Sequence, residues 1–235
     1  MKHEDFNMKD REIKMDNVSQ RRNAIIGFIG GVIFMIGDFL LYMFPGRNPD
    51  LDVDPVFADM PVWRFTGSAL CGFIGMALML FGFQSLYGMT KKVCGNVLPK
   101  ILLIGAAGVG GTTLAHFNLG CLMPFTYKAM LSVGIDPELA DQACQAIIPW
   151  VTPIDLLIII AIFVQAFVLV IMLLGGKSGL SRWFVLMEPI GAITLGVIWK
   201  IVFKDTLIGN AWGACESLGE GLMYLMAYFY WKKNP

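Results

Sequence analysis

The chain has 235 residues, of which 56% are hydrophobic and only 15% are charged. Soluble domains carry about 25% charged residues, so this composition, with a mean hydropathy of +0.64, excludes an ordinary soluble globule. Lys and Arg together number 18, as do Asp and Glu, so no net charge points to a nucleic-acid partner. Repeated apolar runs of about 20 residues instead predict a multi-pass helical protein of the cell (inner) membrane.

The first 23 residues are polar and of mixed charge, and the first apolar run begins at Ala24. No small-residue cleavage pattern follows that run, so we expect it to be retained as a membrane span rather than removed as a signal peptide. The expected organisation is a polar cytoplasmic arm (1–23), a single transmembrane helical domain (24–231) and a cytoplasmic tail (232–235).

Six apolar runs are long enough to cross a hydrocarbon core roughly 30 Å thick, because a helix rises about 1.5 Å per residue. Their expected bounds are 24–43, 67–87, 98–118, 153–174, 183–203 and 207–230. Asp155, shortly after Pro153, is expected to cap the fourth run. The sequence therefore predicts an all-α fold, a six-span transmembrane helical bundle.

Basic residues near the span ends predict the orientation, because Lys and Arg favour the cytoplasmic side. Most of them fall on the side that holds both termini: Lys2, Lys9, Arg11, Lys14, Arg21, Arg22, Lys91, Lys92, Lys100, Lys177, Arg182, Lys232 and Lys233, against Arg47, Arg64, Lys128, Lys200 and Lys204 on the other. We therefore expect both termini in the cytoplasm and the acidic loop 50–59 outside.

Residues 121–135 are apolar, but the segment is short and is interrupted by Pro124 and Lys128. A seventh span here would move the basic residues that follow to the outer side, against the charge rule. We therefore expect an interfacial or partly re-entrant outer helix over 121–135.

A second short outer helix is expected to follow, with Asp136 as its N-cap and Pro137 at its first position. Its buried stripe would consist of Leu139, Ala143, Ala146 and Ile147. Two short outer helices would thus lie between spans 3 and 4. Cys121 and Cys144 fall in them, and the sequence leaves open whether a disulfide joins the two.

The sequence indicates no cofactor and no metal. The glycine-rich stretch 105–113 lacks the lysine of a phosphate-binding loop and lies inside a span. His116 is the single histidine within a span, which excludes bis-histidine haem ligation in the bilayer.

Ionisable side chains inside spans are costly and by default mark function. Asp38, His116, Lys200, Glu216 and Glu220 are all expected in the outer half of the bundle. They predict an outward-opening polar cavity, with Glu220 as its floor and Asp38, His116 and Glu216 as its walls. The expected ligand-binding residues are Asp38, Thr112, His116, Asn118, Lys200, Trp212, Glu216 and Glu220.

Trp212, Glu216 and Glu220 are spaced to share one helix face. Two carboxylates one turn apart in a low dielectric cannot both ionise cheaply, so we expect one of them to hold a proton.

Several of these polar residues also have a purely structural interpretation. Asp38 is able to pair with His116 or Lys200, and Lys200 to reach the interface by itself. Glu188 is suited to the start of the fifth helix, and Gln165 to an interhelical hydrogen bond.

The pattern Ile36-Gly37-Asp38-Phe39-Leu40-Leu41-Tyr42, followed by Ala115-His116-Phe117, resembles bacterial multi-pass membrane protein families of unknown function. The resemblance covers the first half of the chain. It implies a membrane-embedded helical fold and no particular activity.

Three functions compete. The leading one is binding or transport of a small polar or cationic solute, with or without coupling to protons, because buried carboxylates outnumber buried cations. The second is an intramembrane enzyme for a lipid-like substrate, with His116 or Glu216 as general acid or base and Asp38 orienting His116. The third is a structural or sensory subunit. The bilayer and a small solute or lipid-like ligand are the expected partners, and the oligomeric state is left open.

Overall fold

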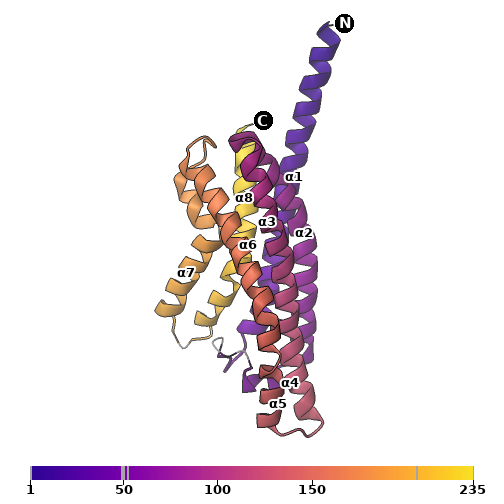
Figure 1. Cartoon of the computed structure of the whole chain (residues 1–235), viewed down its shortest axis with the longest axis vertical. Coiled ribbons are helices and arrows are strands. Elements are labelled where there is room, and N and C mark those ends of the chain that lie inside the picture. The colour runs from indigo at the N-terminus through magenta and orange to yellow at the C-terminus, as the bar shows by residue number, and fades with distance from the viewer. Residues whose placement is uncertain (1, 49–50, 52, 205, 235) are drawn as a thin grey trace.

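The computed structural model describes residues 2–48, 51, 53–204 and 206–234, with side chains from Asp16 onward. Within these residues every regular element is helical and no strand occurs, which confirms the all-α prediction (Figure 1). In chain order the elements are α1 (Lys2–Tyr42), η1 (Pro55–Ala58), α2 (Val62–Cys94), α3 (Val97–Ala115), the π-helical turn η2 (His116–Leu122), α4 (Met123–Ser132), α5 (Pro137–Gln145), α6 (Ile148–Leu174), η3 (Arg182–Met187), α7 (Pro189–Val202), η4 (Gly209–Ala214) and α8 (Cys215–Lys233).

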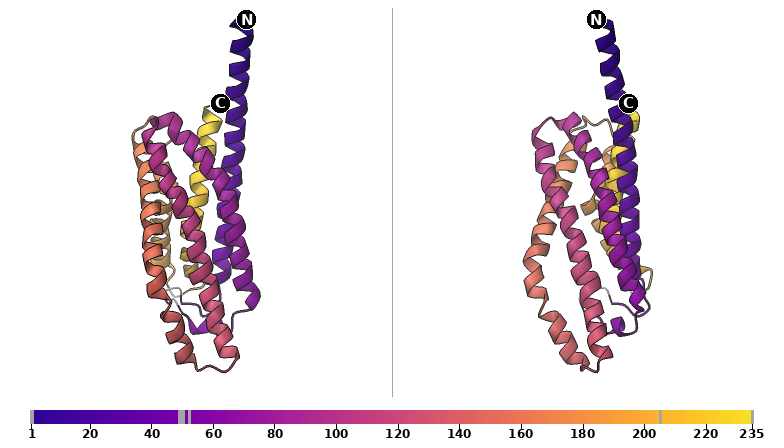
Figure 2. Two further views of the ribbon diagram at one scale, coloured as in Figure 1. Left: turned by 45° about the vertical axis from the view of Figure 1, so that its right-hand side comes forward. Right: turned by 90° about the vertical axis from the view of Figure 1, so that its right-hand side faces the viewer.

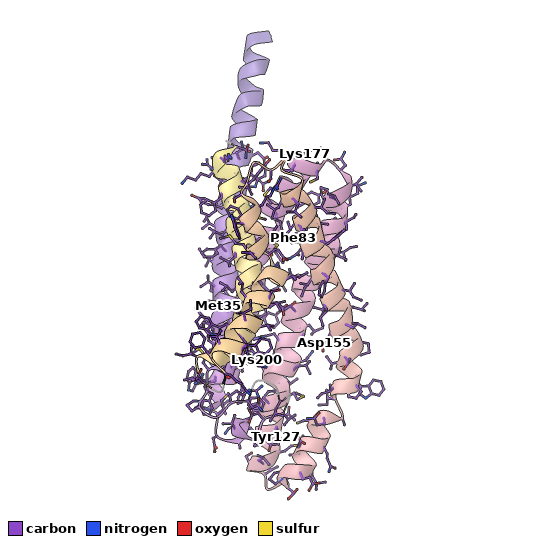
Figure 3. All side chains as sticks on the ribbon, turned by 90° about the vertical axis from the view of Figure 1, so that its left-hand side faces the viewer. Met35, Phe83, Tyr127, Asp155, Lys177 and Lys200 are labelled. Carbon is purple, nitrogen blue, oxygen red and sulfur yellow. The ribbon has the colours of Figure 1, made fainter. Side chains whose placement is uncertain are left out.

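The long helices run side by side as one elongated bundle (Figures 1 and 2). α1 begins and α8 ends at the same end of this bundle, which we call the terminal end. α4 and α5 lie at the opposite end, which we call the distal end. Lys177 lies at the terminal end, Tyr127 near the distal end, and Asp155 and Lys200 in the distal half (Figure 3).

Four helices of the described chain are long and apolar enough to cross a membrane: 16–42, 62–94, 97–132 and 148–174. They contain the first four expected spans, except that the first helix ends at Tyr42, one residue before the predicted end. The helix of the fifth expected span is shorter than predicted, since α7 has 14 residues. It begins at Pro189 because Glu188 caps it, accepting hydrogen bonds from the backbone of Ile190 at 3.0 Å and Gly191 at 2.7 Å.

The sixth expected span also starts later than predicted. Residues 209–214 form the 3₁₀ turn η4, and the α-helix begins only at Cys215. Conversely, α6 begins at Ile148, before the predicted start, and Pro153 lies inside it. The predicted cap at Asp155 is therefore wrong, because that residue lies well within the helix.

The prediction of a separate outer helix over 121–135 is also wrong. α3, η2 and α4 form one continuous helix from Val97 to Ser132. The chain passes Pro124 without a break because the π-helical turn just before it is wider than an α-helical turn. A proline ring would otherwise crowd the carbonyl group four residues earlier, at Gly120.

The second predicted outer helix is present as α5, and Asp136 caps it by accepting a hydrogen bond from the Glu138 N–H at 2.9 Å. Its predicted buried stripe is wrong: Leu139 is 60% exposed, whereas Ala140 and Cys144 are fully buried. These small side chains let α5 approach the rest of the bundle closely. Cys121 and Cys144 are both free thiols, so no disulfide joins them.

Glycines determine how closely α1, α2 and α8 approach one another. A Cβ atom added at Gly31 on α1 would collide with the backbone of Gly221 on α8, and one added at Gly27 would collide with Gly82 on α2. Lipid provides no hydrophobic drive for helices to associate, so such backbone contact supplies the van der Waals energy of packing. Gly110 on α3, by contrast, would meet nothing within 4 Å.

We expect Gly31→Ala to destabilise the protein by about 1–3 kcal/mol, because its methyl group overpacks the contact between α1 and α8. Gly110→Ala is the matched control, and it should melt like the parent. Thermal melting of purified protein in detergent measures both. Equal melting of the two variants would contradict this packing.

Candidate functional site

Asp38 on α1 and His116 at the start of η2 form a buried pair. The Asp38 Oδ1 atom lies 3.1 Å from His116 Nδ1, and each side chain is only 8% exposed. The second oxygen of Asp38 accepts a hydrogen bond from the Ser217 hydroxyl on α8 at 2.5 Å. The carboxylate therefore connects three segments that are far apart in the sequence. Of the two partners expected for Asp38, His116 and Lys200, the structure shows His116.

The hydrogen bonds around His116 indicate its protonation state. Its Nε2 atom lies 3.0 Å from the Ser68 hydroxyl and 3.2 Å from the Ser68 carbonyl oxygen. The Ser68 hydroxyl donates its one proton to the Gly37 carbonyl at 2.8 Å, so it accepts from Nε2. Both ring nitrogens thus face oxygen atoms, an arrangement that suits an imidazolium beside the Asp38 carboxylate.

Ser68, His116 and Asp38 have the order of contacts of a serine hydrolase triad, but the hydrogen bonds run the wrong way for catalysis. In a triad the histidine nitrogen accepts the serine proton, whereas here the Ser68 proton points to Gly37. Ser68 is also fully buried. The trio is therefore suited to holding α1, α2 and η2 together, and nothing in it favours the general-base role considered for His116.

Glu216 and Glu220 lie one turn apart on α8 and receive hydrogen bonds from neutral groups. The Thr112 hydroxyl lies 3.3 Å from Glu216 Oε1 and 3.1 Å from the Gly108 carbonyl, so its proton serves one of them at a time. Gln165 Nε2 donates to both oxygens of Glu220, at 3.1 and 3.3 Å. The interhelical bond expected of Gln165 is thereby confirmed.

An unpartnered polar atom lies beside Glu220. Among the described residues, Gln165 Oε1 is buried and makes no hydrogen bond, while Nε2 of the same amide donates to Glu220. Tyr224 also lies beside Glu220, as a further neutral donor. Buried polar groups normally find partners, so this cluster is a place where water, a proton carrier or a small solute would gain hydrogen bonds.

Trp212 does not continue the α8 face as predicted, because it belongs to the 3₁₀ turn η4. Its ring instead lies under Lys200, with Nζ 4.6 Å from the ring centroid. The ring of Tyr42 packs against the neighbouring Gly213, and Tyr42 interacts electrostatically with both Asp38 and Glu216. Tyr42 and Trp212 thus lie between the distal surface and the buried carboxylates.

A cavity of about 460 Å³ opens at this distal surface between the α1 end and the α7–α8 connection. Lys200, Arg47 and Lys204 line it, whereas Asp38, His116, Glu216 and Glu220 do not. This cavity is therefore not the predicted outward-opening polar cavity with Glu220 as its floor. Asn118 lies partly exposed in η2, and no described hydrogen bond joins its side chain to the site.

Sequence reasoning missed Ser68 and Ser217, which complete the Asp38–His116 contacts. Serines are common in packed membrane helices, and no spacing in the sequence marks these two. It also assigned Asp155 to a helix cap, whereas its Oδ1 is buried without a hydrogen-bond partner among the described residues.

We expect Asp38→Asn and His116→Gln each to destabilise the protein by about 3–5 kcal/mol, because each leaves one buried charge without its partner. The double variant should lose less than the sum of the two, since it removes both charges. Unfolding in mixed detergent micelles, with Glu138→Gln on the exposed face of α5 as a control, measures this cycle. Additive losses would show that the two groups do not interact.

The comparisons with known proteins place the chain in a family without assigning an activity. Residues 8–234 match the model described as "Family of unknown function (DUF6796)". No curated protein and no solved structure matches the chain. Since the match covers nearly the whole chain, this apolar helical bundle belongs to that family of unknown function.

Proposed function

We propose that the chain is a six-span protein of the cell membrane with both termini in the cytoplasm. Four crossings would be the long apolar helices, and α7 and α8 would supply the remaining pair. α8 has 19 residues, about 28 Å at 1.5 Å per residue. An even number of crossings agrees with α1 beginning and α8 ending at the same end of the bundle.

We propose further that Glu216 and Glu220 bind a proton or a small cationic solute and carry it through the bundle. The observation that supports this most is their lack of an ion-pair partner: within the described residues, the two ion pairs are Arg47–Asp54 and Asp38–His116. Glu220 is buried and Glu216 is half-buried. Carboxylates inside a bundle with only neutral donors need a proton or a cation to offset the cost of their charge.

The surroundings of the two glutamates support a transient ligand better than a fixed one. The unpartnered Oε1 atom of Gln165, beside Glu220, offers a hydrogen bond to a guest. Tyr42 and Trp212 would close the site from the distal side in this state, and their movement would open it to the cavity beside Lys200. Asp38 and His116, which satisfy one another, would hold the helices in place while this happens.

The proposed topology predicts which positions are reachable from outside intact cells. Val133→Cys, in the turn before α5, where Val133 is 76% exposed, should react with a membrane-impermeant maleimide. Lys177→Cys, at the terminal end, should react only after permeabilisation. The parent protein, with its five native cysteines, supplies the background. The reverse pattern would overturn the orientation on which the proposed route depends.

The proposed role of the glutamates predicts that Glu216→Gln and Glu220→Gln fold like the parent but lose ligand exchange. Each amide keeps the shape and a hydrogen-bond acceptor while removing the charge and the transferable proton. Proteoliposomes with an internal pH-sensitive dye, under an imposed membrane potential, measure proton uptake. Infrared spectroscopy at neutral pH measures the carboxylic-acid band, which each variant should reduce.

Glu138→Gln is the matched control for both measurements, because Glu138 is exposed on α5. It should leave proton uptake, the infrared band and thermal melting as in the parent. A large loss of thermal stability in either Glu216→Gln or Glu220→Gln would assign the carboxylates a structural role instead.

A further inference from the structure

A second polar cavity lies at the terminal end, far from the glutamates. Its volume is about 820 Å³, and α1, α2 and α8 line it. Gly88 on α2 lets the Gln20 side chain of α1 pack closely against it in the cavity wall, because a Cβ atom at this position would lie only 3.3 Å from the Gln20 amide group. The lining residues used below are Asn17, Gln20, Tyr87, Lys91, Lys92 and Trp231.

The lining carries a net positive charge. Lys91 and Lys92, both exposed, face one lining carboxylate, Asp16, whose Oδ1 accepts a hydrogen bond from Gln20 Nε2 at 3.4 Å. Among the described residues neither lysine forms an ion pair. Lys92 is held in place by Trp231, whose ring centroid lies 5.1 Å from its Nζ.

An unpartnered donor lies beside these charges. Asn17 is 3% exposed, and its Nδ2 atom makes no hydrogen bond among the described residues. Trp231, by contrast, is anchored, because its Nε1 donates to the Ser85 carbonyl at 3.3 Å. Two ammonium groups and an unused amide donor form a set that suits a phosphate oxygen.

The depth of the cavity also suits a lipid headgroup. Tyr87 and Trp231 lie where α2 and α8 approach the end of their apolar stretches, as aromatic residues do at the membrane interface. Basic pockets between membrane helices at this level bind anionic lipid headgroups. The lysines also complement the carboxyl end of α2, but that role alone requires neither the cavity nor the buried Asn17.

We propose that this cavity binds a phosphate group, either of an anionic membrane phospholipid or of a soluble phosphate compound. The lysines supply the charge, and the buried Asn17 supplies a hydrogen bond. This site is separate from Glu216 and Glu220, so the two proposals are tested independently of one another.

The test uses the full-length protein in neutral detergent with added phosphatidylglycerol, or phosphatidylcholine of the same acyl chains. Native mass spectrometry counts the bound lipid, and thermal melting measures its effect. We expect phosphatidylglycerol to bind preferentially and to raise the melting temperature. Lys91→Gln with Lys92→Gln should weaken binding about 25-fold, from about five-fold per lysine, whereas Lys91→Arg with Lys92→Arg should retain most of it.

Lys100→Gln with Lys177→Gln removes the same charge at the same end and serves as the matched control. It should bind phosphatidylglycerol like the parent, as should Glu220→Gln. Inorganic phosphate distinguishes the source of the phosphate group. If phosphate alone stabilises the parent but not the variant with Lys91→Gln and Lys92→Gln, the site binds a soluble phosphate compound. If inorganic phosphate has no effect on the melting temperature of the parent, the site binds lipid. Equal binding of both lipids without a phosphate effect, or equal loss in the control variant, would overturn the proposal.

Discussion

The pairing of Asp38 with His116 is the interaction on which the rest of the interior depends. A charge inside an apolar bundle is tolerable only when an opposite charge and hydrogen bonds surround it. Here they come from four segments: Asp38 on α1, His116 on η2, Ser68 on α2 and Ser217 on α8. These contacts join α8 to the helix formed by α3 and η2, and Glu216 of α8 lies opposite Thr112 of α3.

This division of the buried polar residues separates two kinds of chemistry. Asp38 and His116 satisfy one another, so their charges are compensated within the protein itself. Glu216 and Glu220 receive only neutral donors, and the unpartnered Oε1 atom of Gln165 lies beside Glu220. The first arrangement suits a fixed scaffold, and the second suits an exchangeable proton or solute. Close glycine contacts between α1, α2 and α8 keep the surrounding helices tightly packed.

The two ends of the bundle also differ in chemistry. The distal cavity is lined by Arg47, Lys200 and Lys204, next to aromatic residues that cover the buried carboxylates. The terminal cavity combines Lys91 and Lys92 with an unused amide of Asn17. In the proposed orientation, the first would lie at the outer face and the second would contact the cytoplasmic leaflet, whose anionic lipids attract basic side chains.

The sequence by itself determined the membrane class, the all-helical fold and the first four apolar helices, because apolar length and the hydrogen-bonding needs of the backbone in lipid leave few alternatives. It also indicated His116 as one of two partners for Asp38, the Gln165 bond, the cap at Asp136 and the favourable place of Glu188 near the start of the fifth helix, which depend on residue type and local position. Only the tertiary structure decided that α3 continues through a π-helical turn, that Trp212 leaves the α8 face and that Cys121 and Cys144 stay unpaired. The last two outcomes depend on contacts between segments far apart in the sequence, such as Tyr42 against Gly213 and the burial of α5 through Ala140 and Cys144. No periodicity along one helix records the shape of its neighbours.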